Sequence, residues 1–583
     1  MKIPNILLKT SLLISIFISP SFASGNDTAN NSAIPETKVI ETEKSENTTT
    51  SSSGFSGDYL SSRFSRANGD IDSATKSLEE AYQQSPQSND IAGQLMGLYL
   101  LGGQVDKSIS MAKTIAKTNS KDPISALLLS LGAIKNKDST TASKTLDAVF
   151  EAEDVQLWLP LISAWLDAEQ KKQQKPLIIE ELSAEVGKAA PIVNYHIALI
   201  NAKAGFIDAA AENFKQAIPD PAHPPARVMA MMLQFYKNHN SPKALKPLVE
   251  AYKKANPNIT DNNKIIFIDN LQDGVAEVLF TMGSILMAND ATQEATLYFQ
   301  LALYIKPDME IVTIALAQAY GELQQYGIAD SLFAKIPTTS PLYNSVQLYT
   351  AINLGKTKQY ELAITKLDAL IAASPDNIEN YMAKGDLLRV QEKYAEAILV
   401  YELALAKLKE INSVHWGLYY AIGTSYDKLN NWAEAEKNLR RSLELSSSQP
   451  DTLNYLGYSL LMRGEKLNEA QELIGKALKK RPNDAQIIDS MGWIAYMLGD
   501  YNQSVNYLEQ AITILPADAT INEHLGDIYW RLGRKNEARF QWERAITYED
   551  NEKISDEIRK KLKDGLPSLP EAKITQATTA IKQ

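Results

Sequence analysis

The sequence predicts an all-α fold, a right-handed α-solenoid of about fourteen stacked helix pairs. Ala470, Ser504 and Ala538 lie one 34-residue repeat apart, and the same residue types return at the same offsets around each of them. In the last two of these units a glycine ends a first apolar-periodic segment before a second one begins. A helix pair of this kind cannot bury its apolar stripe alone, so neighbouring pairs stack and share a continuous core.

The composition is compatible with such a solenoid. The chain has 583 residues, 44% of them apolar and 22% charged, which is too long for one compact core but suits a fold whose contacts run between neighbouring repeats. It contains no cysteine, and its five histidines show no paired metal-ligand spacing. We therefore expect no catalytic, cofactor-binding or metal-binding residues and no cofactor. The formal net charge of -11 argues against a nucleic-acid partner.

Residues 1 to 23 have the layout of a secretory signal peptide. Lys2 and Lys9 precede an apolar run, Ser11 to Ser19, and a small-residue cleavage site at Ala23. The run is too short to cross about 30 Å of hydrocarbon as a helix. Without a cysteine at the junction, no lipid anchor is expected. The sequence thus predicts an exported protein in the periplasm of a Gram-negative bacterium.

The remaining chain is predicted to consist of two repeat arms between two polar ends. Residues 24 to 54 and 567 to 583 have the composition of a disordered linker and a disordered tail. The N-terminal arm, 55 to 258, is divergent. The repeat register then slips across an insertion at 259 to 275, and the C-terminal arm with its cap helix covers 276 to 566.

Within each unit, the second helix shows a small residue followed by apolar residues four and seven positions later, which form one helical face. The unit near residue 157 is degenerate because Pro176 takes the place of the small residue. Four extra residues precede Trp416, and one lies near Lys466. The charged stretch from Ile554 to Leu566 is predicted to be the final cap helix.

The recurring glycines and apolar residues are interpreted as packing positions. Close helix approaches are expected at Gly457, Gly492 and Gly526, and core positions at Leu439, Leu508 and Trp542.

The repeat length is that of the tetratricopeptide repeat. The segments NYLGYSLLMRG from Asn454, DSMGWIAYMLGDY from Asp489 and NEHLGDIYWRLGRKNEARFQWERA from Asn522, with GVAEVLFTMGSIL from Gly274, resemble a bacterial branch of secreted repeat proteins. That branch includes the outer-membrane lipoprotein adaptor of a periplasmic carboxy-terminal processing protease. The resemblance covers residues 274 to 545 and implies an adaptor without chemistry of its own. The chain departs from it by lacking the lipidated cysteine.

In stacked helix pairs the first helices line the concave face, here called the inner face, and a fixed set of positions points into it. Applied to the last three units, this rule predicts a partner-binding set of aromatic, acidic and amide side chains with one arginine, the groove residues: Asn454, Tyr458, Asp489, Trp493, Tyr496, Glu523, Asp527, Trp530 and Arg531. Trp, Tyr and Arg are frequent interface hot spots. The alternative is that Trp493 and Trp530 pack against the next unit. The fifth and ninth positions carry no basic residue that could bind the terminal carboxylate of a peptide, and the acidic residues there would repel one. A neutral or basic partner is therefore expected.

We therefore expect a scaffold or adaptor that binds other proteins or peptides, for example a periplasmic protease and a cell-wall hydrolase that it brings together. One alternative is an assembly factor for envelope or polysaccharide-export machinery. Another is a hidden hydrolase between residues 123 and 275, where the repeats are weakest. That stretch shows no phosphate loop, metal-ligand spacing or nucleophile elbow.

Overall fold

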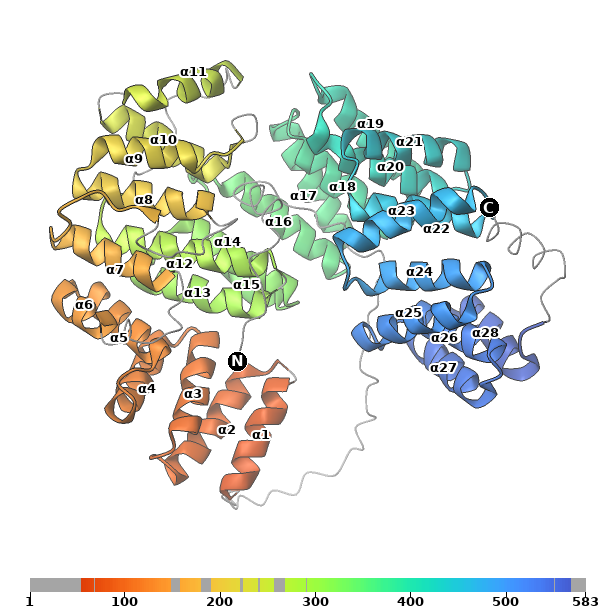
Figure 1. Ribbon diagram of the computed structural model, residues 1–583, viewed down its shortest axis with the longest axis horizontal. Coiled ribbons are helices and arrows are strands. Elements are labelled where there is room, and N and C mark those ends of the chain that lie inside the picture. The colour runs from red at the N-terminus through yellow and green to blue at the C-terminus, as the bar shows by residue number, and fades with distance from the viewer. Residues whose placement is uncertain are drawn as a thin grey trace. The chain divides into compact units, whose positions relative to one another are not determined.

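The computed structural model describes residues 54–67, 69–147, 158–179, 190–220, 224–239, 242–255, 268–289, 291–549 and 551–567. Within these ranges the regular elements are α-helices α1 to α28 and short 3-10 segments, and the predicted all-α repeat solenoid is confirmed (Figure 1). The predicted signal peptide, nearly all of the predicted linker and the tail after Pro567 lie outside the described residues.

The chain forms two compact units that divide between Asn353 and Leu354. Unit 1 contains α1 (Phe55–Ala67), α2 (Ile71–Gln84), α3 (Asn89–Leu101), α4 (Val105–Thr118), α5 (Pro123–Lys135), α6 (Ser139–Asp147), α7 (Trp158–Glu169), α8 (Ala190–Ala204), α9 (Ile207–Gln216), α10 (Ala226–Asn238), α11 (Lys246–Ala255), α12 (Leu271–Met287), α13 (Thr292–Ile305), α14 (Glu310–Glu322) and α15 (Tyr326–Phe333). The division falls inside α16 (Tyr343–Lys356).

Unit 2 contains α17 (Tyr360–Ala373), α18 (Ile378–Val390), α19 (Tyr394–Lys407), α20 (Trp416–Lys428), α21 (Trp432–Leu445), α22 (Pro450–Met462), α23 (Leu467–Lys480), α24 (Ala485–Met497), α25 (Tyr501–Ile514), α26 (Ala519–Arg531), α27 (Lys535–Tyr548) and α28 (Glu552–Asp564). The predicted final cap helix is therefore present as α28. It packs on α27.

Most of the described helices pack as the predicted pairs, as α1 does with α2 and α26 with α27, and second helices such as α4, α19 and α25 also contact the first helix of the next unit. The small and apolar positions that define the repeat are buried, as in Ala74, Leu78 and Ala81 of α2, which are at most 1% exposed. In the degenerate unit the first helix is α7, and the described residues 170–179, which include Pro176, form no α-helix.

Glycines act at two kinds of position. Gly492 and Gly526 lie in first helices where a Cβ atom would collide with Leu508 and with Trp542 of the paired helix, so the predicted close approach is confirmed. Between the two helices of a unit the chain passes through a left-handed residue, such as Gly533 with φ 81°. The extra residue near Lys466 is absorbed there, since Gly464 and Lys466 both have positive φ.

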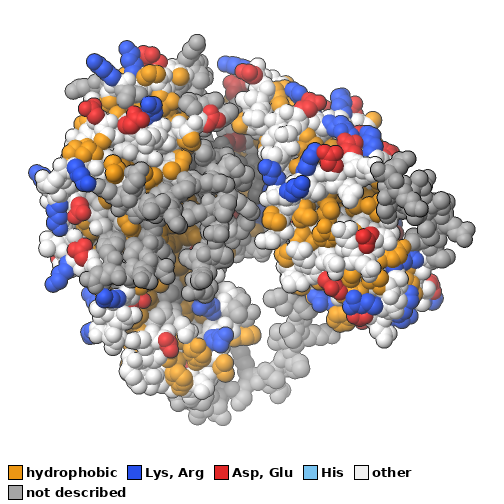
Figure 2. All heavy atoms as spheres, viewed as in Figure 1, with side chains coloured by type: hydrophobic (Ala, Val, Ile, Leu, Met, Phe, Trp, Pro, Cys, Tyr) orange, Lys and Arg blue, Asp and Glu red, His pale blue; other side chains and the backbone are white. Residues whose placement is uncertain are grey.

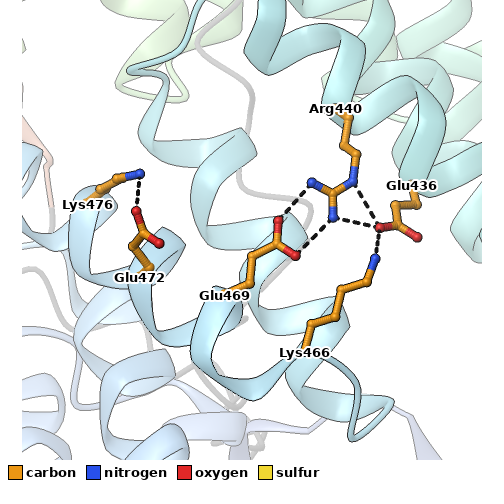
Figure 3. Close-up of polar contacts among 6 residues, drawn as sticks. All are labelled: Glu436, Arg440, Lys466, Glu469, Glu472 and Lys476. Carbon is orange, nitrogen blue, oxygen red and sulfur yellow. Dashed lines mark hydrogen bonds and ion pairs between the residues drawn. The ribbon is translucent and has the colours of Figure 1, made fainter.

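Ion pairs join the second helices of neighbouring units (Figure 3). Arg440 of α21 binds Glu436 of its own helix at 2.7 Å and Glu469 of α23 at 2.8 Å, and Lys466 binds Glu436 at 2.7 Å. These side chains are partly exposed, so each pair adds little on its own. Together they hold α21 and α23 in register.

Unit 1 departs from the expected neighbour-only stacking, because α12 and α13 pack against α3, α5 and α7, many repeats earlier (Figure 1). The Trp165 ring of α7 lies directly over Gly274 of α12. On α13, the Tyr304 hydroxyl donates to Asp106 at 2.8 Å and Gln300 to the Leu101 carbonyl at 3.4 Å. The unit boundary lies beyond the predicted insertion at 259–275, since α12 to α15 belong to unit 1.

Candidate partner-binding face

In unit 2 the first helices contact one another from repeat to repeat, α18 with α20, α22 with α24 and α24 with α26. This row of helices forms the inner face of unit 2. The groove residues lie on its last three members: Asn454 and Tyr458 on α22; Asp489, Trp493 and Tyr496 on α24; and Glu523, Asp527, Trp530 and Arg531 on α26.

Trp493 lies in a stack of rings. Its ring is stacked on Tyr496, with centroids 4.5 Å apart, and on His524 of the next first helix, with centroids 3.9 Å apart. Its side chain is partly buried, and its indole Nε1 has no hydrogen-bond partner among the described residues. These contacts are the ones expected if Trp493 packs against the next unit.

Asp489 holds His524 in this stack. The His524 Nδ1 lies 2.9 Å from a carboxylate oxygen of Asp489, and both side chains are 8% exposed. Burial acts to lower the pKa of His524, but the negative charge of Asp489 outweighs burial and raises it. Asp489 is thus engaged inside the fold.

The acidic groove residues of α26 are paired with the cap helix. Lys561 of α28 lies 2.7 Å from Glu523 and 2.7 Å from Asp527. The Trp542 indole also donates to Asp527 at 2.8 Å. Burial nevertheless raises the pKa of Asp527. Because these carboxylates have a cationic partner within the chain, they provide little charge to attract a basic partner. The expectation of a basic partner therefore loses its support from these residues.

Trp530 and Arg531 lie at the end of this face. The Trp530 ring is 5.3 Å from that of Trp542, and Gly565 lies against its edge. Arg531 donates to the Tyr496 hydroxyl at 3.2 Å. Both side chains are partly exposed.

The most accessible part of the face is on α22. Asn454 and Tyr458 are partly buried, and Met462 in the next turn is 54% exposed. Burial, with the charges of Asp489 and Glu523, raises the pKa of Tyr458, which therefore remains a neutral hydrogen-bond donor. The Asn454 Oδ1 has no partner among the described residues.

The corresponding positions of unit 1 are different. The fifth and ninth positions of α5, α7 and α8 are apolar or aromatic and at most 4% exposed: Leu127, Leu131, Leu161, Trp165, Tyr195 and Leu199. Helix α12 packs on α5, α7 and α8, and α13 also packs on α5. Sequence reasoning missed this difference, although the apolar character of these positions was a visible signal.

One buried ion pair fixes α12 in unit 1. Glu277 of α12 is fully buried and accepts hydrogen bonds from the Tyr195 hydroxyl at 2.7 Å and from Arg227 at 3.0 and 2.7 Å. Burial acts to raise the pKa of Glu277, but Arg227 and Tyr195 outweigh it and lower the pKa. Nearby, the buried His196 lies 3.1 Å from Thr281, and burial lowers its pKa to about 4, so it is neutral.

Two kinds of site are absent from the described ranges. They contain no cluster of three or more His, Asp or Glu side chains arranged to hold a metal ion. No helix among them combines the length and the apolar character needed to cross a bilayer.

Comparisons with known proteins agree with the helix pairs. Tetratricopeptide repeat models match residues 65–131, 350–410, 420–485 and 490–552. A TPR repeat-containing protein of Pseudomonas aeruginosa is 32% identical over 160 residues, which is 27% of this chain and 26% of that protein. Human tetratricopeptide repeat protein 13 is 28% identical over 153 residues, 26% of this chain and 17% of that protein. The matches thus span about a quarter or less of these relatives.

Among solved structures, the Cut9–Hcn1 hetero-tetramer of the APC/C covers 88% of this chain and 97% of its own at 15% identity, with a TM-score of 0.40. YrrB, described as a TPR protein with an unusual peptide-binding site, covers 30% of this chain at 23% identity, with a TM-score of 0.25. Tetratricopeptide repeat models thus match stretches of both units, and those stretches consist of paired helices.

Proposed function

We propose that this protein is an exported scaffold that binds other proteins through the inner face of unit 2, between α22 and α26. In this proposal it acts in the periplasm, where it brings a protease and its substrate together and so raises their local concentration. The signal-peptide layout of residues 1 to 23 supports export. The tetratricopeptide repeats support protein binding.

The contrast between the inner faces carries the proposal. At the fifth and ninth positions unit 1 has buried apolar residues under α12, whereas unit 2 has Asn454, Tyr458 and Trp493, which remain partly exposed. A partner that covers Tyr458 and Met462 would bury apolar surface and gain hydrogen bonds from the same face.

Site-specific photo-crosslinking tests the binding face. Trp493→Ala and Trp530→Ala variants would be ambiguous tests, because the partly exposed rings also pack on His524 and Trp542 of the same chain. A photoreactive amino acid at Met462 in the full chain, expressed in a Gram-negative host, is expected to capture a periplasmic protease or a wall hydrolase. The control carries it at Leu362, which is 53% exposed on the second helix α17.

Identical adducts from both positions would contradict binding at this face. Capture of envelope-assembly or polysaccharide-export components from Met462 alone would replace the protease pathway with the alternative function. Export has a separate readout, because the mature protein is expected to begin at Ser24. A cytoplasmic protein with an intact Met1 segment would refute it.

A further inference from the structure

Two cations, Lys535 and Arg539, lie near the ring of Trp530 at the turn from α26 to α27, and a third, Arg531, follows Trp530 in the sequence. Arg531 ends α26, Lys535 begins α27 and Arg539 follows one turn later. The Lys535 ammonium lies 3.7 Å from the centroid of the Trp530 ring, and the Arg539 guanidinium lies 5.4 Å from it. Cations at such positions are attracted by the ring face. We call these four residues the cationic corner.

The cations of this corner differ from their neighbours in having no carboxylate partner among the described residues. Arg534 pairs with Glu509 at 3.2 Å and also with Glu537, and Lys561 pairs with Asp527. Lys535 and Arg531, by contrast, donate to neutral oxygens. Lys535 donates to the Trp530 carbonyl at 2.7 Å, and Arg531 to the Pro567 carbonyl at 2.6 Å.

Two bases lie at the start of α27. The helix begins at Lys535, with Arg534 as its N-cap, carries the acidic Glu537 in its first turn and has no basic residue in its last turn. Glu537 is paired with Arg534, so it does not neutralise Lys535. Basic side chains are unfavourable at a helix N-terminus and favourable at its C-terminus. Lys535 and Arg539 are also four residues apart, where like charges repel. An anion bound at this turn would reduce both the unfavourable interaction of Lys535 with the helix N-terminus and the repulsion between Lys535 and Arg539.

The electrostatic environment of Lys535 also favours a bound anion. Burial and the neighbouring charges of Arg531 and Arg539 lower the pKa of Lys535. Lys and Arg side chains are visible on the surface over α27 and α28, beside Asp and Glu side chains (Figure 2). The corner is continuous with the groove residues, since Arg531 donates to Tyr496, which is stacked on Trp493.

We propose that the cationic corner docks an internal acidic segment of the partner protein, with Asp or Glu side chains against Arg531, Lys535 and Arg539 and an apolar side chain against Trp530. This assignment rests on the proposed function and adds the chemistry of the partner. The net charge of -11 of the whole chain repels a long polyanion and so disfavours its binding. A short acidic segment contacts only the cationic corner and is attracted by it. The three bases lie at the end of α26 and in the first turns of α27, where they offer hydrogen-bond donors to side-chain carboxylates.

The test uses the full chain and a fluorescent peptide with four consecutive Glu residues and blocked ends. Anisotropy is expected to show binding that weakens with salt, and no binding of the matched Gln peptide. Lys535→Gln/Arg539→Gln is expected to weaken binding about tenfold. The control Lys479→Gln/Lys480→Gln removes the same charge from the exposed end of α23 and should leave affinity unchanged.

Equal affinity of the two double variants would overturn the proposal. Tighter binding of inorganic polyphosphate than of the Glu peptide would also overturn it, by showing a general polyanion site. Binding that needs a free terminal carboxylate on the peptide would exclude an internal segment. Loss of folding is checked by thermal melting, and Lys535→Arg should retain binding. If the Met462 crosslink persists in Lys535→Gln/Arg539→Gln at full yield, the proposed function stands and the corner assignment fails.

Discussion

The two units use one repeat to build two different inner faces. In unit 1 the first helices α7 and α8 are buried nearly all round, because α12 of the same unit lies on them. In unit 2 the first helices α22, α24 and α26 keep a partly exposed row of aromatic and polar side chains. The 34-residue register therefore determines the fold, and the apolar residues at the fifth and ninth positions of α5, α7 and α8 accompany an inner face that is core.

The two units also differ in how they hold a carboxylate on a helix. Glu277 in unit 1 is fully buried and has Tyr195 and Arg227 as partners. Glu379 on α18 of unit 2 has no side-chain partner among the described residues, and burial raises its pKa to about 7. The first stabilises an internal contact, and the second is destabilising when charged.

The largest effect is expected from breaking the buried pair in unit 1. Glu277→Ala leaves the Arg227 guanidinium buried without its carboxylate and should lower the free energy of unfolding by about 3–5 kcal/mol. Urea denaturation, with hydrogen exchange of α12, measures this. The matched change at a surface pair, Glu469→Ala opposite Arg440, should cost at most about 1 kcal/mol. Equal losses in both variants would show that α12 is not fixed by this pair.

The next effect is a pH dependence from Glu379. Its folded-state pKa of about 7 exceeds the unfolded value of 4.5, so the unfolded chain loses this proton first as pH rises. Stability should therefore fall between pH 4.5 and pH 7 by up to about 3 kcal/mol. Glu379→Gln removes this loss, so it should be more stable than the parent at pH 8 and equal to it at pH 4. Parallel stability curves for both proteins would refute the assignment.

A smaller effect separates two helical glycines. Gly274→Ala places a methyl group against Trp165 and should destabilise unit 1 by about 2 kcal/mol. Gly475→Ala on α23 meets no atom within 4 Å and should stabilise its helix by about 0.5–1 kcal/mol. Thermal melting compares the two. A tolerated Gly274→Ala would mean that α12 is not closely packed on α7.

The smallest effect concerns His524. Its folded-state pKa is raised above 6.5, so its stabilising contact with Asp489 is complete below pH 6.5 and is lost as pH rises through the folded value. Asp489→Asn should lower the His524 pKa in an NMR titration. His415, whose pKa burial lowers, should not move. A native His524 pKa below 6.5 would contradict the pairing.

The part of the fold that sequence predicts is the part that local pattern determines. The buried Ala470, Leu508 and Trp542 follow from helical periodicity within one unit. The docking of α12 depends on contacts such as Trp165 with Gly274, which lie far apart in the chain, and the slip at 259–275 shows only that the regular stacking ends. Position rules placed Arg531 in the candidate site. They missed Lys535 and Arg539 because those residues belong to a second helix.

Single-cysteine labelling tests the central claim most directly, since the chain contains no native cysteine. Ala168→Cys places a thiol on α7 in unit 1, where the native residue is 4% exposed, and Met462→Cys places one on the inner face of unit 2, where it is 54% exposed. Maleimide should label Cys at 462 within seconds and Cys at 168 only upon unfolding, and a bound partner should slow labelling at 462. Rapid labelling at 168 in the native protein would contradict a closed inner face in unit 1. Labelling at 462 that a bound partner leaves unchanged would contradict a binding face in unit 2.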